Sequence, residues 1–141
     1  MILDNPKISV ILSNFNGEKY INLSIESFLS QNYNNKELII VDGKSTDESH
    51  KVIENYENKY SNIIWISDID SGISEAINFG LQKCSGDIIM QMGHDDILQP
   101  KVFSNIDQLT SSNCILATNT SSISISAIAK STKKPQNVIG M

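Results

Sequence analysis

The sequence predicts an α/β fold, a three-layer sandwich in which helices cover both faces of a mainly parallel sheet. Short apolar runs that are typical of buried strands alternate with segments whose apolar residues recur at helical spacing. Such strict alternation is typical of parallel sheets. The 141 residues fit one domain, and 40% hydrophobic and 19% charged residues are ordinary values for a folded protein.

Four strands are expected in the first hundred residues, at 8–12, 38–41, 63–66 and 88–92. Each is a short apolar run, and polar residues follow each one. The residues after the four runs are, in order, Asn14-Phe15-Asn16-Gly17, Asp42-Gly43, Asp68 with Asp70, and Gly93-His94-Asp95-Asp96.

Three helices are expected between these strands. The first has apolar residues at helical spacing at Ile21, Ile25, Phe28 and Leu29. The second is expected to start at a capping box formed by Ser45 and Glu48, and to turn Val52, Ile53, Tyr56 and Tyr60 inward. The third carries the clearest amphipathic stripe, at Ile73, Ala76, Ile77, Gly80, Leu81 and Cys84.

After Pro100 the alternation continues but the composition changes. We expect a helix at 101–110, a strand at 114–118, a short helix at 122–131 and the start of a strand at 138–140. From residue 101 onward the only acidic residue is Asp107, against four lysines. The sequence leaves open whether these last strands join the sheet or stay frayed.

The charge and the cysteines narrow the class of protein. A net charge of −5 argues against a nucleic-acid backbone or an anionic membrane surface as the partner. Cys84 and Cys114 have no CxxC spacing and are expected to be free thiols in a reducing compartment. With no signal-peptide pattern and no apolar run of membrane-spanning length, a cytoplasmic chain is expected.

The carboxyl ends of the strands are the expected functional edge, because open parallel sheets bind ligands there. Carboxylates follow three of the four strands: Asp42 after the second, Asp68 and Asp70 after the third, and Asp95 and Asp96 after the fourth. Oxygen ligands of this kind favour Mg²⁺ or Mn²⁺, which would neutralise a diphosphate leaving group.

Structural explanations for the same residues stay open. Asp42 and Asp68 are also ordinary turn residues at strand exits, and Asp95-Asp96 could cap a following helix. His94 is expected to be an exposed loop residue rather than a ligand.

Residues 8–100 resemble the family 2 glycosyltransferases, which are inverting enzymes that use nucleoside diphosphate sugars. Four motifs carry the resemblance: SVILSNFNGEKYINLSIESFLSQNY, ELIIVDGKSTDES, WISDIDSGISEAINFGLQKCSGDII, and the Asp95-Asp96 pair before ILQP. The resemblance implies a Rossmann-like GT-A fold, here incomplete relative to the full family fold.

The resemblance also implies roles for individual residues. Phe15 and Asn16 would line the nucleotide pocket, and Asp42 would bind the base or the ribose. Asp70, Asn78 and Gly80 would belong to the segment near the sugar. Asp95 would be the metal-binding aspartate of the DxD motif, with Asp96 beside it and Mg²⁺ or Mn²⁺ as the cofactor. The chain departs from the family pattern at Gly93, which replaces the first aspartate of DxD, and at Lys44, which replaces a common glycine.

The last third resembles a different family. CILATNTSSISISAIAKSTKKPQNVIGM is similar to the NAD-binding domain of the 3-hydroxyacyl-CoA dehydrogenases. The resemblance places Ser121 at a substrate-contacting position, with Asn119 in the same turn. NAD binding is not expected, because the sequence has no GxGxxG loop. The domain division expected from these resemblances is 1–98 and 99–141, with the junction between residues 97 and 113.

The expected function is binding of a nucleoside diphosphate sugar, with weak or absent transfer because the acceptor half and its catalytic base are missing. Two alternatives stay open: a non-catalytic chimeric α/β fold that binds nothing tightly, and a remnant of a 3-hydroxyacyl-CoA dehydrogenase. The sugar, the acceptor and the oligomeric state are not predicted.

Overall fold

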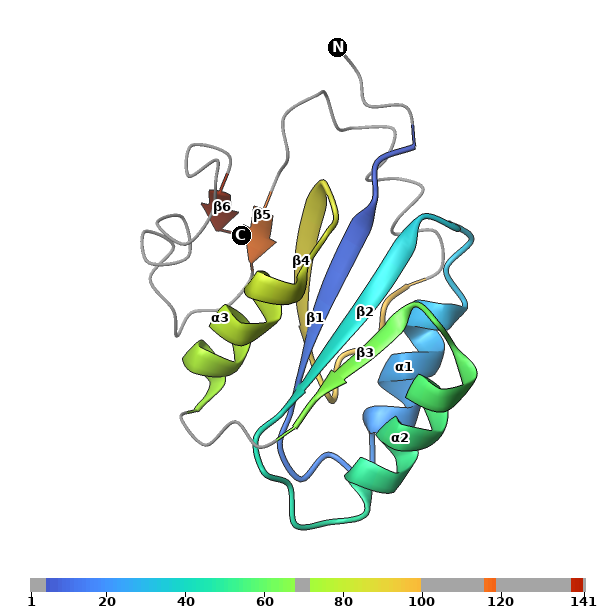
Figure 1. Cartoon of the computed structure of the whole chain (residues 1–141), viewed down its shortest axis with the longest axis vertical. Helices are drawn as coiled ribbons and strands as arrows, with labels where there is room; N and C mark the ends of the chain where they lie inside the picture. Colours follow the sequence, from blue (N-terminus) through green and yellow to red (C-terminus); the bar gives the residue numbers. More distant parts are fainter. Residues whose placement is uncertain (1–4, 68–71, 100–115, 119–137, 141) are drawn as a thin grey trace.

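The computed structural model describes residues 5–67, 72–99, 116–118 and 138–140, and the statements below concern these residues. The helices and strands alternate along most of the chain (Figure 1). Their order is β1 (Ile8–Asn14), α1 (Ile21–Leu29), β2 (Lys36–Asp42), α2 (Ser49–Lys59), β3 (Ile63–Ile66), α3 (Ile73–Lys83), β4 (Ile88–Gly93), β5 (Leu116–Thr118) and β6 (Val138–Gly140).

The strands form one parallel sheet in the order β3-β2-β1-β4-β5-β6. This confirms the predicted parallel α/β fold. The chain winds outward from β1 through β2 to β3, then crosses back to add β4 on the other side of β1. The sheet therefore has its topological switch point between β1 and β4. The two short strands β5 and β6 extend the sheet beyond β4, so the expected last strands do join it.

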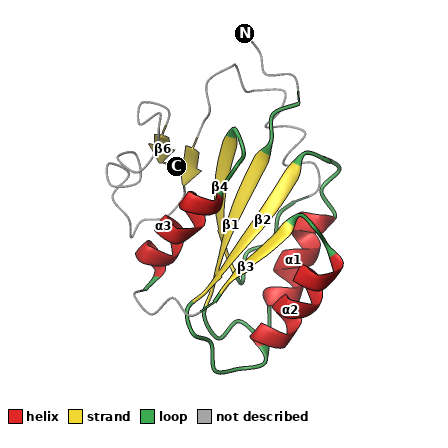
Figure 2. Cartoon of the chain, in the orientation of Figure 1, coloured by secondary structure: helices red, strands yellow, loops and turns green. Residues whose placement is uncertain are grey.

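Helices lie on both faces of the sheet, with α1 and α2 on one face and α3 on the other (Figure 2). Side chains alternate between these faces along each strand. Val10 and Leu12 of β1 belong to the core cluster that includes α1 and α2, whereas Ile11 packs with Ala76 and Ile77 of α3. These two clusters are the two interfaces of a three-layer sandwich.

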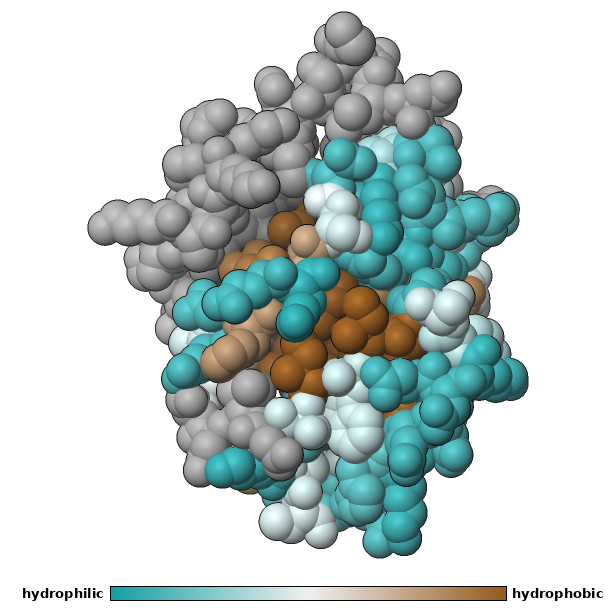
Figure 3. All heavy atoms as spheres, in the orientation of Figure 1, coloured by the Kyte–Doolittle hydropathy of each residue, from teal (hydrophilic) through white to brown (hydrophobic). Residues whose placement is uncertain are grey.

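Some apolar side chains of β3 and α3 remain partly exposed among the described residues. Figure 3 shows apolar atoms gathered beside α3 in this view. Ile64 of β3 and Phe79 of α3 are 36% and 37% exposed, respectively. Ile64 shares its face of the sheet with Ile66, which packs against the α3 cluster.

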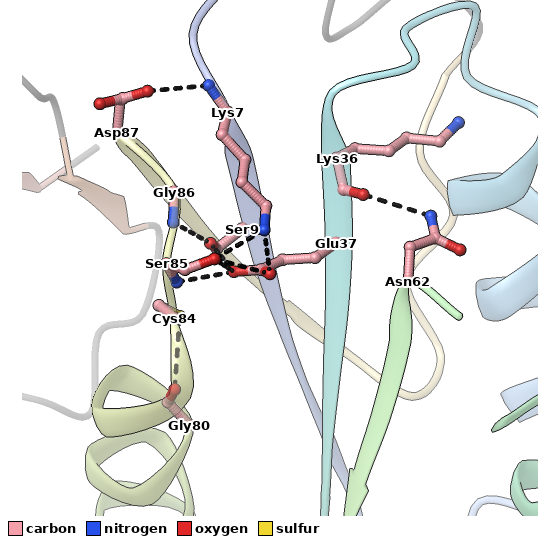
Figure 4. A network of polar contacts seen from close by, with 10 residues as sticks. All are labelled: Lys7, Ser9, Lys36, Glu37, Asn62, Gly80, Cys84, Ser85, Gly86 and Asp87. Atoms are coloured by element: carbon pink, nitrogen blue, oxygen red, sulfur yellow. Dashed lines mark hydrogen bonds and ion pairs between the residues drawn. The ribbon is translucent and has the colours of Figure 1, made fainter. Parts of the chain in front are cut away.

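A polar network joins β1, β2 and the turn before β4 at the amino end of the sheet (Figure 4). Glu37 is the centre of this network. Its carboxylate accepts hydrogen bonds from Ser9 Oγ at 2.6 Å and from the Ser85 amide at 2.7 Å, and it pairs with Lys7 Nζ at 2.6 Å. Because every partner is a donor, the buried charge is compensated and the network fixes the α3–β4 turn against the sheet.

The prediction of a capping box at the start of the second helix is wrong. The α2 helix begins at Ser49, and its N-cap residue, Glu48, makes no side-chain capping hydrogen bond. Ser45 instead donates to Asp42, and Glu48 pairs with Lys51. Ser45 is therefore part of the loop above β2 and not of the helix.

Several expectations lie outside the described residues: the helices at 101–110 and 122–131, and the environment of Cys114. The expected strand at 114–118 is described over Leu116–Thr118. Cys84 is a free thiol, and burial raises its pKa to about 12. Among the helices in the described part of the chain, none combines the length and apolar character that crossing a bilayer requires.

Candidate functional site at the carboxyl ends of the strands

Two loops meet above β1 and β2, and we call them the β1 loop (residues 15–20) and the β2 loop (residues 43–48). Hydrogen bonds run between them in both directions. The Asn16 amide donates to Ser45 Oγ at 2.9 Å, and Asn16 Oδ1 accepts from the Thr46 amide at 2.8 Å. The Glu18 amide donates to Asp47 Oδ2 at 2.8 Å. The loops therefore form one connected surface at the functional edge expected from the sequence.

Asp42 lies beneath this surface, at the end of β2, and is only 3% exposed. Its Oδ1 accepts hydrogen bonds from Asn14 Nδ2 and from Ser45 Oγ, both at 2.6 Å. Its Oδ2 accepts from the Ser45 amide at 2.9 Å. A carboxylate held by three donors is firmly oriented, and its negative charge is stabilised in a nearly dry position.

Asp47 secures the junction between the loops and α2. It accepts hydrogen bonds from the Ser49 hydroxyl and amide and from the Glu18 amide. Burial acts to raise the pKa of Asp47, but these hydrogen bonds outweigh burial and hold the pKa below its ordinary value of 3.8. Asp47 is thus ionised at neutral pH, and it keeps the β2 loop acidic.

Gly17 marks the point where the β1 loop comes closest to the end of β4. A Cβ built on Gly17 would stand 2.2 Å from Asn14 Oδ1 and 2.8 Å from His94 Cγ, closer than any real side chain allows. The glycine is therefore required by close approach. It brings the ends of β1 and β4 together at the switch point, where open parallel sheets bind ligands.

Asp95 and Asp96 follow β4 and are both exposed. Asp96 Oδ2 accepts a 2.7 Å hydrogen bond from the Gly93 amide. A Cβ on Gly93 would stand 3.0 Å from Asp95 Oδ1 and 3.4 Å from Asp96 Oδ2, so both carboxylates fold back over the glycine. The same segment is tied to α1, because Ser24 Oγ donates to the His94 carbonyl at 2.6 Å.

The other predicted site residues are placed less closely together. Phe15 is 60% exposed on the β1 loop. Asn78 is exposed on α3, on the opposite face of the sheet from α1 and α2. Asp68, Asp70, Asn119 and Ser121 lie outside the described residues. In the described part of the chain, no three His, Cys, Asp or Glu side chains converge into a group that could hold a metal ion.

Sequence reasoning gave Ser45 only a helix-capping role, named Asn14 and Gly17 only as residues after the first strand, and gave Ser49 no role, although all four are central to this site. Asn14 and Ser49 are buried, and both contribute to the polar cluster around Asp42. The sequence feature that could have indicated a role for Asn14 is a polar residue at the end of an apolar strand. Its importance depends on the alignment of β1 with β2, which places Asn14 opposite Asp42.

Comparison with known families gives a match over most of the chain. The profile of the family described as Glycosyl transferase family 2 matches residues 9–117. An uncharacterized glycosyltransferase from Haemophilus influenzae is 37% identical over 97 residues, which are 68% of this chain and 39% of that protein. The chain thus spans well under half of this relative's length.

Two solved structures share this fold. TarS 1-349 of S. aureus, in complex with UDP-GlcNAc, aligns with a TM-score of 0.67 and 26% identity over 72% of this chain and 30% of that chain. The mannosyltransferase PcManGT of Pyrobaculum calidifontis, in complex with GDP-Man and Mn²⁺, aligns with a TM-score of 0.70 and 18% identity over 83% of this chain and 36% of that chain. At this identity the second likeness concerns the fold alone.

Proposed function

Because this chain belongs to glycosyl transferase family 2, we propose that residues 1–98 bind a nucleoside diphosphate sugar at the carboxyl ends of β1, β2 and β4. Phe15, Asn16 and Asp42 would contact the nucleoside. Asp70 and Asn78 would lie toward the sugar.

One observation carries this proposal. The β1 loop contacts the β2 loop on one side and the end of β4 on the other, where Gly17 lies close to His94 at the switch point of the sheet. A crevice at a switch point is the usual ligand site of an open parallel sheet. The TarS chain, which shares this fold, is solved with UDP-GlcNAc, and this supports a nucleoside diphosphate sugar as the ligand here.

The carboxylates after β4 fit a divalent cation that is shared with the ligand. Mg²⁺ is usually held by one or two carboxylates, with substrate phosphates and waters completing its coordination. Asp95 and Asp96 supply two carboxylates, both oriented over Gly93, so a full protein ligand set is not needed. Bound Mg²⁺ or Mn²⁺ would neutralise charge on the leaving diphosphate.

The reaction proposed for the whole protein is transfer with inversion at the anomeric carbon. The acceptor oxygen forms a bond to the anomeric carbon while the bond between this carbon and the diphosphate oxygen breaks. The proton of the acceptor hydroxyl passes to a base. We assign no described residue as this base. We expect the 141-residue chain by itself to bind the donor but to transfer sugar weakly or not at all.

The test is thermal unfolding of the purified chain with and without uridine diphosphate and Mn²⁺. A ligand that binds only the folded state stabilises it by about 2.7 kcal/mol at a hundredfold excess over its dissociation constant. We expect an upward shift of the midpoint that is lost in Asp42→Ala. Guanosine diphosphate is included as a second probe, since the base is not assigned. A cooperative transition that neither diphosphate shifts would reject nucleotide binding and favour a folded chain without this ligand.

For residues 99–141 we propose a structural role, the extension of the sheet by β5 and β6. Their likeness to the 3-hydroxyacyl-CoA dehydrogenases rests on the sequence, and the family match extends to residue 117, inside β5. We expect no NAD binding. An NAD-induced rise in the thermal midpoint that Ser121→Ala removes would support the dehydrogenase-like reading instead.

A further inference from the structure

We propose that Asn14 is the positioning residue of the nucleoside site: it fixes the Asp42 carboxylate in the orientation that binds the nucleoside. This inference rests on the proposed function, since it assigns a cause to the binding geometry of Asp42. Asn14 itself need not touch the ligand, because it is 3% exposed and lies beneath the β1 and β2 loops.

The side-chain amide of Asn14 has two N–H donors and three acceptor oxygens within hydrogen-bonding distance. Nδ2 lies 2.6 Å from Asp42 Oδ1, 3.1 Å from Ser45 Oγ and 3.1 Å from Ser49 Oγ. These acceptors belong to the end of β2, the β2 loop and the first residue of α2. One amide therefore connects all parts of the strand–loop–helix unit that carries Asp42.

The carbonyl oxygen of the same amide, Asn14 Oδ1, is buried and accepts no hydrogen bond from the residues that the structure describes. It is directed at Gly17, since a Cβ there would stand 2.2 Å away. A buried unpaired carbonyl is unfavourable for folding. The contacts of Nδ2, and not the carbonyl, therefore account for the fixed position of this side chain.

The two oxygens of the Asp42 carboxylate differ in how many hydrogen bonds they accept from the described residues. Oδ1 accepts from both Asn14 and Ser45, whereas among the described residues Oδ2 accepts only from the Ser45 amide. A carboxylate oxygen has room for a second donor. Oδ2 is thus the oxygen that can accept an N–H of the base or a hydroxyl of the ribose.

A second cross-strand pair provides a matched control within the same two strands. Ser9 pairs with Glu37 as Asn14 pairs with Asp42, in the same β1–β2 register and with the same 2.6 Å distance between donor and carboxylate. The Ser9–Glu37 pair lies at the amino end of the sheet (Figure 4). Removing Ser9 Oγ therefore removes an equivalent hydrogen bond far from the site.

The experiment measures uridine diphosphate affinity by calorimetry in saturating Mn²⁺, together with the thermal midpoint without ligand. The proteins are the wild type, Asn14→Ala, Ser9→Ala, Asp42→Asn and the double variant of Asn14→Ala with Asp42→Asn. We expect Asn14→Ala to weaken binding at least about tenfold, the loss typical of one hydrogen bond to a charged group. Ser9→Ala should lower the midpoint but leave the affinity within about twofold of the wild type.

The double variant tests whether Asn14 acts through Asp42. If it does, Asn14→Ala causes no further loss of affinity when Asp42 is already Asn. Should Asn14→Ala not unfold cooperatively, Asn14→Leu replaces it, because leucine is similar in size to asparagine but has no hydrogen-bond donor.

Three results would overturn the proposal, and they are distinguishable. Wild-type affinity in the folded Asn14 variant means that the amide is only structural. Additive losses in the double variant mean that Asn14 acts independently of Asp42. Absence of binding by the wild type, with either uridine or guanosine diphosphate, rejects the proposed function and this inference with it.

Discussion

Gly80 of α3 lies directly against Ile11 of β1: a Cβ added to the glycine would stand 2.6 Å from Ile11 Cγ2 and 3.2 Å from Cγ1. Both residues are buried, and no other residue type would let the helix approach the sheet so closely. The family resemblance implied that Gly80 belongs to a segment near the sugar. In the structure Gly80 contacts the core residue Ile11, so it allows α3 to pack closely against the sheet.

Gly80→Ala should therefore destabilise the chain. The added methyl group would force α3 away from Ile11 or distort that side chain, and overpacking of this kind costs about 1–3 kcal/mol. The higher helix propensity of alanine offsets about 1 kcal/mol of this cost. Urea unfolding should give a net loss of stability, with Gln82→Ala, an exposed position on the same helix, as the control. Equal or greater stability for Gly80→Ala than for the control would contradict the packing argument.

Glu37 should make the stability of the chain sensitive to acid. Burial acts to raise its pKa, but hydrogen bonds from Lys7, Ser9 and Ser85 outweigh burial and hold the pKa below the ordinary value of 4.5. A carboxyl group with a depressed pKa stabilises the fold above its unfolded-state pKa, and this stabilisation is lost as the pH falls through the folded-state pKa.

The measurement is urea unfolding of the wild type and Glu37→Gln from pH 7 to pH 3. At pH 7 the wild type should be more stable by about 1–3 kcal/mol, because the variant loses charge-assisted hydrogen bonds. This difference should shrink below pH 4.5, the ordinary pKa of the group. Glu54→Gln, an exposed position on α2, serves as the control. A difference that stays constant across the pH range would show that ionisation of Glu37 does not contribute.

The sheet was predictable because its central strands are uninterrupted apolar runs. The bounds of β3 agree with the prediction, whereas β2 begins two residues earlier than the expected 38–41, at Lys36. Lys36 and Glu37 interrupt the apolar pattern, yet both are buried. Lys36 Nζ donates to the carbonyls of Leu29 and Gln31, and Glu37 has the partners shown in Figure 4. Both charged residues are accommodated by partners outside the strand, which periodicity along the chain does not reveal.

The candidate site was predictable in its location but not in its internal contacts. The positions of the expected strand ends indicated that Asn16, Asp42 and the residues after β4 lie at one edge of the sheet, and the structure has them there. The pairing of Asn14 with Asp42 depends on strand register, and a single sequence does not contain the register. Ser45 was expected to cap a helix, but the nearby Asp42 carboxylate is a stronger acceptor and takes its hydroxyl.

Lys44 offers a test of backbone strain in the β2 loop. It has a φ of 58°, in the left-handed region that costs an ordinary residue about 1–2 kcal/mol. A glycine, which the family resemblance implies at this position, would adopt this φ without strain. Lys44→Gly and Lys44→Ala both remove the same side-chain contacts, but only glycine relieves the strain.

Lys44→Gly should therefore be more stable than Lys44→Ala by about 1 kcal/mol, the strain relief less the greater unfolded-state freedom of glycine. Denaturant unfolding of the two variants under identical conditions measures the difference. Asn5, which also has a positive φ of 59°, provides a second site for the same comparison. Higher stability of the alanine variant at position 44 would mean that the loop does not retain this conformation in solution.

Asp95 and Asp96 should differ in how much they contribute to metal-dependent binding. Asp96 Oδ2 is engaged by the Gly93 amide, an interaction that the carbonyl of an asparagine could retain. Asp95→Asn removes a carboxylate charge whose Oδ1 faces the same space over Gly93. We therefore expect Asp95→Asn to weaken uridine diphosphate binding in Mn²⁺ about tenfold or more, and Asp96→Asn to weaken it less. In the presence of a chelator both variants should bind as the wild type does, because the metal contribution is then absent from all three.

Calorimetric titrations with Mn²⁺ and with chelator make the comparison, and Asp87→Asn at the amino end of the sheet is the control. Equal losses with and without Mn²⁺ would show that the carboxylates act on the nucleotide without a metal, and binding unaffected by either variant would remove both residues from the site.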